Sequence, residues 1–136
     1  MTYLEICQQQ LPIDEGKRSL PYKDTVGILT IGVGRNLEKG LSDDEIALLL
    51  KNDIAEADKA ARAVFPAFDN LSEPRKAVLV NMAFNLGQAR LADFKNTLAA
   101  IAAGNYDKAA DGMLASKWAV QVGQRAQRLA KVMRDG

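Results

Sequence analysis

Two carboxylates near the start of the chain are spaced so that they could divide the work of glycosidic bond cleavage. Glu15 follows an apolar stretch and precedes Gly16, a setting that would half-bury its carboxyl and raise its pKa. Asp24 lies nine residues later at an expected turn, where solvation would keep it ionised. One protonated and one ionised carboxyl can serve as the acid and the base of such a reaction. Spacing alone is a weak indication, because the chain has 17 acidic residues and most acidic residues lie in solvent.

The segment that carries Asp24 is typical of a small sheet. Residues 17–34 are rich in strand formers and are interrupted by Gly27, Gly32 and Gly34, which indicates a bulge or a close backbone approach. A bend near Thr25–Gly27 predicts a hairpin. The two carboxylates would then flank the first strand.

Helices are expected on both sides of this sheet. A short one is predicted over residues 3–11, limited by Pro12. Ser42 and Glu45 form a capping-box pattern that begins a long amphipathic helix over 43–63. Phe65-Pro66 ends it.

The remainder of the chain is predicted to be helical. Pro74 follows Ser72 and Glu73 as a start signal, and residues 77–86 are apolar on nearly all sides, so this helix should be buried and end at Gly87. Short helices are expected over 90–94, 96–103, 106–116 and 124–134. The predicted fold class is therefore α+β, mostly α, with a small β-sheet near the N-terminus.

Composition excludes several kinds of chemistry. The chain has no histidine and one cysteine, Cys7, so histidine-centred catalysis, disulfides and most zinc sites are excluded. We expect no metal and no cofactor, and Cys7 is interpreted as a small core residue.

No stretch approaches the roughly 20 apolar residues of a membrane span. The first ten residues are too polar for a signal peptide, so synthesis in the cytoplasm is expected.

Charge is distributed unevenly along the chain. Residues 1–70 have twelve acidic and eight basic side chains, whereas residues 71–136 have five and ten. A basic C-terminal face could bind an anionic polymer such as nucleic acid, although a solvated helix surface explains the same charges. Gly32-Val33-Gly34 lacks the third glycine and the Lys-Ser/Thr of a phosphate loop. A helical nucleic-acid binder that uses the basic face is an alternative function, but we expect no nucleic acid partner.

The string E-G-x(5)-Y-x-D-x(2)-G-x(2)-T-I-G-x-G, from Glu15 to Gly34, resembles the signature of phage-type lysozymes (endolysins). The resemblance continues through Asn81–Gly87, Phe94–Leu98, Ser116–Trp118 and Arg125–Arg128. It covers most of the chain, and the first string is its most specific part.

The resemblance implies a single lysozyme-like catalytic domain over 1–136. It has a small lobe of about 13–45, a linking helix of about 43–63 and a helical lobe of about 64–136 that also includes an N-terminal helix at 2–11. Peptidoglycan glycan strands would bind between the lobes. The reaction would be hydrolysis of the β-1,4 bond between N-acetylmuramic acid and N-acetylglucosamine.

The resemblance also assigns roles to residues. Glu15 would be the general acid, Asp24 the opposing carboxylate, and Thr30 would help to place the attacking water. Inversion of the anomeric centre is expected, which requires carboxyls about 6.5–9.5 Å apart.

Four further residues match or adjoin positions that contact substrate in this family: Asn36, Phe84, Thr97 and Arg125. For Phe84 and Thr97 the alternatives are a core residue and a helix cap. Arg125 would lie close to Glu15, where its charge would favour the ionised acid.

Other residues have structural interpretations. Asn81 and Asn85 lie on one face of their helix and are expected to bind backbone groups, and Trp118 is interpreted as core.

Three departures from the family pattern stand out. Arg35 replaces a histidine, so an ion pair there would change partner or lose its pH dependence. The segment over residues 38–41 is shorter than in relatives that have an additional strand and loop there. Gly112 stands where relatives can present a polar side chain.

Two alternatives remain within this resemblance. One is a lytic transglycosylase that cleaves the same bond with one Glu and forms an anhydro product, and the other is a non-catalytic cell-wall binder. We expect a monomer without a membrane anchor. It would leave the host cytoplasm through a holin-type pore, or be delivered by a virion, to act on the periplasmic cell wall.

Overall fold

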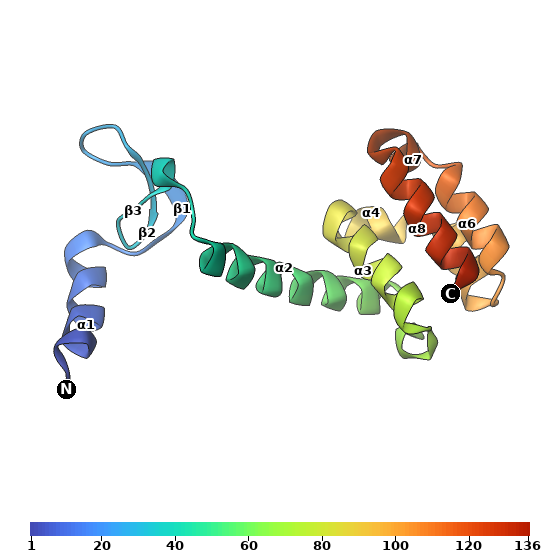
Figure 1. The fold of residues 1–136 in the computed structure, drawn as a ribbon, viewed down its shortest axis with the longest axis horizontal. Helices are drawn as coiled ribbons and strands as arrows, with labels where there is room; N and C mark the ends of the chain where they lie inside the picture. The colour runs from blue at the N-terminus through green and yellow to red at the C-terminus, as the bar shows by residue number, and fades with distance from the viewer. The chain divides into compact units, whose positions relative to one another are not determined.

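The computed structural model describes residues 1–136 and divides them into two compact units, Met1–Leu48 and Leu49–Gly136. Helices dominate, and one three-stranded antiparallel sheet lies in the N-terminal unit (Figure 1). The predicted α+β, mostly α, class is confirmed. None of the helices is both long enough and apolar enough to cross a bilayer.

The N-terminal unit begins with α1 (Tyr3–Glu15). Thr2 and Glu5 form a capping box in which the Glu5 amide donates to Thr2 Oγ1 at 3.2 Å and the Thr2 amide donates to Glu5 Oε2 at 2.8 Å. The helix was expected to stop before Pro12, but it continues to Glu15. A proline removes one intrahelical hydrogen bond and adds steric strain, which this helix accommodates until Gly16, at φ 80°, ends it.

The sheet has the strand order β1 (Arg18–Lys23), β2 (Leu29–Gly32) and β3 (Arg35–Asn36). The hairpin expected near residues 25–27 is confirmed, because β1 and β2 pair antiparallel around that turn. Pro21 lies where the pairing of β1 becomes irregular, between Arg18 and Tyr22. A proline has no amide to donate, so an edge strand with an irregular register is its usual position in a sheet. A short 3-10 helix, η1 (Leu37–Lys39), follows.

The long helix α2 (Asp43–Val64) confirms the expected helix over 43–63 and spans the boundary between the two units. The Ser42 amide donates to Glu45 Oε1 at 2.9 Å and the Glu45 amide donates to Ser42 Oγ at 3.2 Å. This is the capping box that the sequence predicts.

The C-terminal unit is entirely helical beyond α2. Its elements are η2 (Phe68–Asn70), α3 (Glu73–Leu86), α4 (Gln88–Ala92), α5 (Lys95–Ala102), α6 (Tyr106–Leu114), α7 (Lys117–Val122) and α8 (Gln124–Asp135). Ser72 caps α3 and Gly87 ends it, as expected. The helix expected over 106–116 ends at Leu114, and Ser116 begins the separate helix α7 by accepting a hydrogen bond from the Ala119 amide.

The core of this unit forms where α8 packs against α3, α6 and α7 (Figure 1). Its largest fully buried side chains are Val78, Leu79, Met82, Leu91, Met113 and Met133. Trp118 is 3% exposed, which confirms its interpretation as core. Cys7 was expected to be a core residue, but it is exposed because no residue of α1 is buried.

Candidate active site

Asp24 occupies the turn between β1 and β2 and is held there by backbone amides. Its Oδ1 accepts hydrogen bonds from the amides of Val26 at 2.9 Å and Ile28 at 2.8 Å. The Gly27 amide donates to the Asp24 carbonyl at 3.1 Å, which closes the turn. The side chain is half-buried rather than fully solvated as expected, since the turn folds around it. Both of these amides bond to one carboxylate oxygen, which leaves Oδ2 available to a reactant.

Thr30 lies on the central strand β2 and is 5% exposed. It pairs with Tyr22 of β1 on one side and with Asn36 of β3 on the other. Its hydroxyl donates to the Ile28 carbonyl at 2.9 Å. Because that proton is committed, the oxygen can only accept a hydrogen bond from a water beside it.

A single residue therefore anchors both side chains. The Ile28 amide donates to Asp24 and the Ile28 carbonyl accepts from Thr30. The backbone at position 28 fixes a carboxylate and a hydroxyl acceptor on the same hairpin, an arrangement suited to directing a water molecule.

Glu15 is the last residue of α1 and lies against the turn between β2 and β3. A Cβ placed on Gly34 would stand 3.2 Å from Glu15 Oε2 and 3.5 Å from Glu15 Cβ. The absence of a side chain at Gly34 thus lets this carboxylate pack closely on the turn. Glu15 is exposed rather than half-buried as expected, because α1 has no buried residue.

Asn36 and Arg35 both make contacts within the N-terminal unit. Asn36 Oδ1 accepts from the Glu38 amide at 2.8 Å and caps η1, so its oxygen has a structural role. Arg35 forms an ion pair with Glu45. The pKa of Glu45 is lowered, first by the backbone hydrogen bond from Ser42 and then by Arg35.

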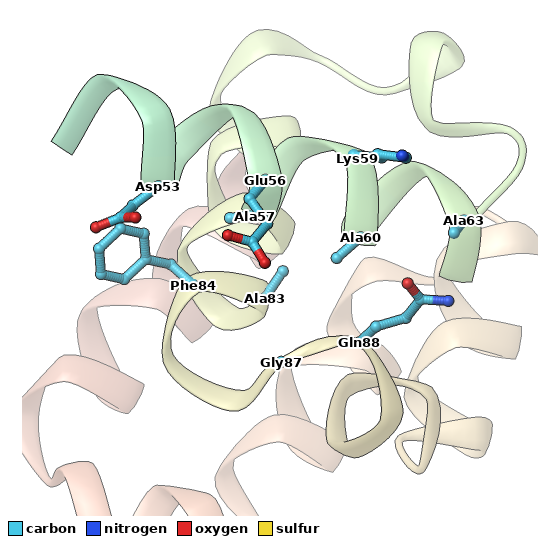
Figure 2. A pocket seen from close by; sticks show the side chains of 10 residues that line it. All are labelled: Asp53, Glu56, Ala57, Lys59, Ala60, Ala63, Ala83, Phe84, Gly87 and Gln88. Atoms are coloured by element: carbon cyan, nitrogen blue, oxygen red, sulfur yellow. The ribbon is translucent and has the colours of Figure 1, made fainter. Parts of the chain in front are cut away.

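In the C-terminal unit, Phe84 lines a cavity of about 560 Å³ between α2 and the end of α3. Figure 2 shows its ring and the carboxylates of Asp53 and Glu56 directed into this cavity. Phe84 is 46% exposed, so the core alternative is wrong. The helix that carries it is not buried on all sides, because Phe84 and Asn85 face outward.

Arg125 pairs with the side chain of Asn81. Its Nε and Nη2 donate to Asn81 Oδ1 at 3.0 and 2.7 Å. Asn85 Oδ1 accepts from Trp118 Nε1 at 2.8 Å. The two asparagines were expected to bind backbone groups. Instead they bind mainly side chains of α8 and α7. The side-chain oxygens of these asparagines on α3 face donor side chains of neighbouring helices and not unpaired backbone N–H groups.

Thr97 is the third residue of α5 and is 6% exposed, so it is not the cap that one alternative suggested. It lines a second cavity, of about 520 Å³, together with Gly112. No cluster of His, Cys, Asp and Glu side chains that could bind a metal ion is present.

The match to known proteins agrees with the string in the N-terminal unit. Residues 13–134 match the Phage lysozyme family. The chain belongs to that family. It is accordingly a glycoside hydrolase of the lysozyme type.

Two similar proteins come from Dictyostelium discoideum. Probable T4-type lysozyme 2 is 26% identical, and Probable T4-type lysozyme 1 is 27% identical; each match covers 95% of this chain and 94% of the relative. The pre-baseplate central spike protein Gp5 of Enterobacteria phage T4 is 27% identical over 94% of this chain but only 27% of its own length. The first two alignments run over 159 positions against 136 residues in this chain, so these lysozyme relatives carry residues that it lacks.

The sequence does not single out every residue that shapes this candidate site. Ile28 falls within the run of strand formers over residues 17–34 and has no further signal, because an anchor that acts through its backbone does not depend on the type of side chain. Gly34 was noted as a close-approach glycine, and the structure identifies Glu15 as what approaches it. The Asp24–Gly27 turn has a recognisable signal, since Asp at the first position accepts from the amide two residues on.

Proposed function

We propose that this lysozyme hydrolyses the β-1,4 bond between N-acetylmuramic acid and N-acetylglucosamine in bacterial peptidoglycan, with Glu15 as general acid and Asp24 and Thr30 directing the attacking water. The family supports peptidoglycan hydrolysis by a muramidase-type enzyme. The observation that carries the residue assignment is the shared anchoring of Asp24 and Thr30 by Ile28.

In this mechanism, Glu15 donates its proton to the glycosidic oxygen as the bond to the sugar breaks. Water donates one hydrogen bond to Thr30 Oγ1 and its other proton toward Asp24 Oδ2, and its oxygen attacks the anomeric carbon. Attack from the face opposite the leaving group gives a product of inverted configuration. Asp24 also stabilises positive charge on the sugar ring in the transition state.

The test is hydrolysis of purified peptidoglycan by Glu15→Gln. Loss of the general acid should lower kcat by at least about 100-fold. Asp14→Asn, an exposed neighbour on α1, is the matched control and should keep full activity. Full activity of Glu15→Gln, or an equal loss in Asp14→Asn, would contradict the assignment.

The product separates hydrolysis from the alternatives. Proton NMR during the first turnovers should show the inverted anomer at the new reducing end. An anhydro-muramic product, lighter by one water in mass spectrometry, would indicate a transglycosylase. Binding to peptidoglycan without any soluble product would indicate a wall binder.

A further inference from the structure

One cavity of the C-terminal unit, of about 520 Å³, has a positively charged wall. It lies between the end of α4, the start of α5, the end of α6 and the start of α7. Arg90, Lys95 and Lys117 line it, against one acidic residue, Asp93. None of these four side chains is in an ion pair within 4.0 Å. Three cations minus one carboxylate give a local charge of +2, which favours an anion that carries two charges.

Backbone donors at the start of α5 have no partner in the protein. Phe94 is the N-cap residue and provides no side-chain cap, and the first backbone hydrogen bond of the helix is from the Leu98 amide to the Phe94 carbonyl at 2.9 Å. The amides of Lys95, Asn96 and Thr97 are therefore unpaired. Unpaired amides at the positive end of a helix dipole favour a negatively charged group.

The hydroxyl of Thr97 is a buried donor without a partner beside these amides. Thr97 is 6% exposed and lines the cavity, and its hydroxyl takes part in none of the side-chain hydrogen bonds. No polar side-chain atom that is sealed from solvent lacks a partner, so this unpaired oxygen is reached from the cavity. A Cβ at Gly112 would stand 2.5 Å from Thr97 Oγ1. The glycine therefore keeps the space beside the hydroxyl open.

Apolar side chains form another part of the wall. Leu86, Phe94 and Trp118 line the cavity, and the rings of Phe94 and Trp118 pack edge to face with their centroids 6.0 Å apart. A tetrahedral anion fills only part of this volume, so an organic group can occupy the remainder. An apolar wall with a few placed polar groups is typical of small-ligand sites.

We propose that this cavity binds the phosphate dianion of a small organic phosphomonoester. A phosphomonoester carries nearly two negative charges at neutral pH and three strong acceptor oxygens, which match the local charge and the several unpaired donors. The amides at the start of α5 and the Thr97 hydroxyl donate to the phosphate oxygens, and the cations of the wall neutralise its charge. The site is independent of the proposed hydrolysis, because binding there does not require Glu15 or Asp24.

Fluorescence of the full chain tests the ligand class. Trp118 is the only tryptophan of the chain and lines the cavity, so its emission reports on a bound ligand. At constant ionic strength, phenyl phosphate should change this emission with saturation and bind at least about tenfold more tightly than dimethyl phosphate, a diester with one charge. Equal affinity for the diester would overturn the preference for a dianion. Equal affinity for inorganic phosphate would show that the organic group is not recognised and would overturn the monoester assignment.

Variants test the residues of the site. Lys95→Ala and Thr97→Val should each weaken the binding of phenyl phosphate about three- to tenfold. Lys131→Ala removes an exposed lysine of α8 outside the cavity and is the charge-matched control, which should bind as the wild-type protein does. An equal loss in this control would show that only the net charge matters and would overturn the proposal.

NMR of the unaltered chain locates the ligand without relying on any variant. Phenyl phosphate should shift the amide signals of Lys95, Asn96 and Thr97 with the same saturation as the Trp118 emission. Equal shifts of these signals with chloride at the same ionic strength would overturn the proposal, and so would shifts confined to residues outside the cavity.

Discussion

Asp24 has a structural role and a proposed chemical role, and each role belongs to a different oxygen of its carboxylate. Oδ1 receives the amides of Val26 and Ile28, whereas the reaction requires a charged carboxylate toward water. An asparagine keeps an oxygen for the amides but has no negative charge. The two roles can therefore be separated by substitution.

We expect Asp24→Asn to lower kcat at least about 100-fold while it changes the free energy of unfolding by less than about 1 kcal/mol. Asp24→Ala should lower kcat similarly and also destabilise the protein by about 1–3 kcal/mol, because two amides lose their acceptor. Initial rates on peptidoglycan and urea denaturation measure the two effects. An active Asp24→Asn would remove this carboxylate from the mechanism.

Gly34 is expected to position Glu15. In Gly34→Ala the new methyl would press on the Glu15 carboxylate, since a Cβ stands 3.2 Å from Oε2 at a residue with φ 67°. Activity should fall about tenfold or more because misplacing a reacting group is costly. Gly40→Ala is the control: it has φ 74° with no atom within 4 Å, so it has comparable backbone strain without the contact. Equal activity of the two variants would contradict a positioning role.

At the scale of elements, the start of α2 links helix capping to charge. Glu45 closes the capping box with Ser42 and pairs with Arg35. Its pKa is lowered by these contacts, so the ionised form stabilises the folded state above the unfolded-state pKa. That stability is lost as the pH falls through the lowered folded-state pKa. An arginine stays charged throughout, so only Glu45 sets the pH dependence of this pair.

Glu45→Gln isolates this charge, because glutamine also completes a capping box. We expect the variant to melt at a lower temperature than the wild-type protein at pH 7, and the difference to disappear well below the pKa of about 4.3 of a free Glu. Thermal melts at a series of pH values provide the measurement. A difference that persists in acid would show that the effect is not electrostatic.

Elements with local signals were predictable from the sequence. The box at Ser42, the proline after Ser72 and the glycine at 87 set the ends of α2 and α3, because capping depends on residues within one turn. The continuation of α1 through Pro12 was not predictable, since it depends on tolerating a lost hydrogen bond. The exposure of Phe84 and Glu15 also depends on packing with distant elements, so it could not be read from helical periodicity.

In the tertiary structure, hydrogen bonds from Arg75 connect the last turn of α8 to the start of α3. Arg75 donates from Nε to the Met133 carbonyl at 2.8 Å and from Nη2 to the Arg134 carbonyl at 3.0 Å. Its guanidinium lies 3.4 Å from the centroid of the Tyr106 ring. One side chain thus joins α3, α6 and the last turn of α8.

We expect Arg75→Ala to lower the free energy of unfolding by about 2–4 kcal/mol, since charge-assisted hydrogen bonds and a cation–π contact are lost together. Arg128→Ala, at an exposed position of α8 with no ion pair or hydrogen bond, should change it by less than about 0.5 kcal/mol. Urea denaturation of both variants decides the point. A similar free energy of unfolding in the two variants would show that the contacts of Arg75 do not stabilise the protein.

The anchoring of Asp24 and Thr30 has a consequence for how this protein can diverge. Both hydrogen bonds engage the peptide groups of Ile28, which every amino acid except proline provides in full. Substitution of Ile28 by other amino acids should therefore keep the positions of the Asp24 carboxylate and the Thr30 hydroxyl. Proline would be the one replacement that selection removes.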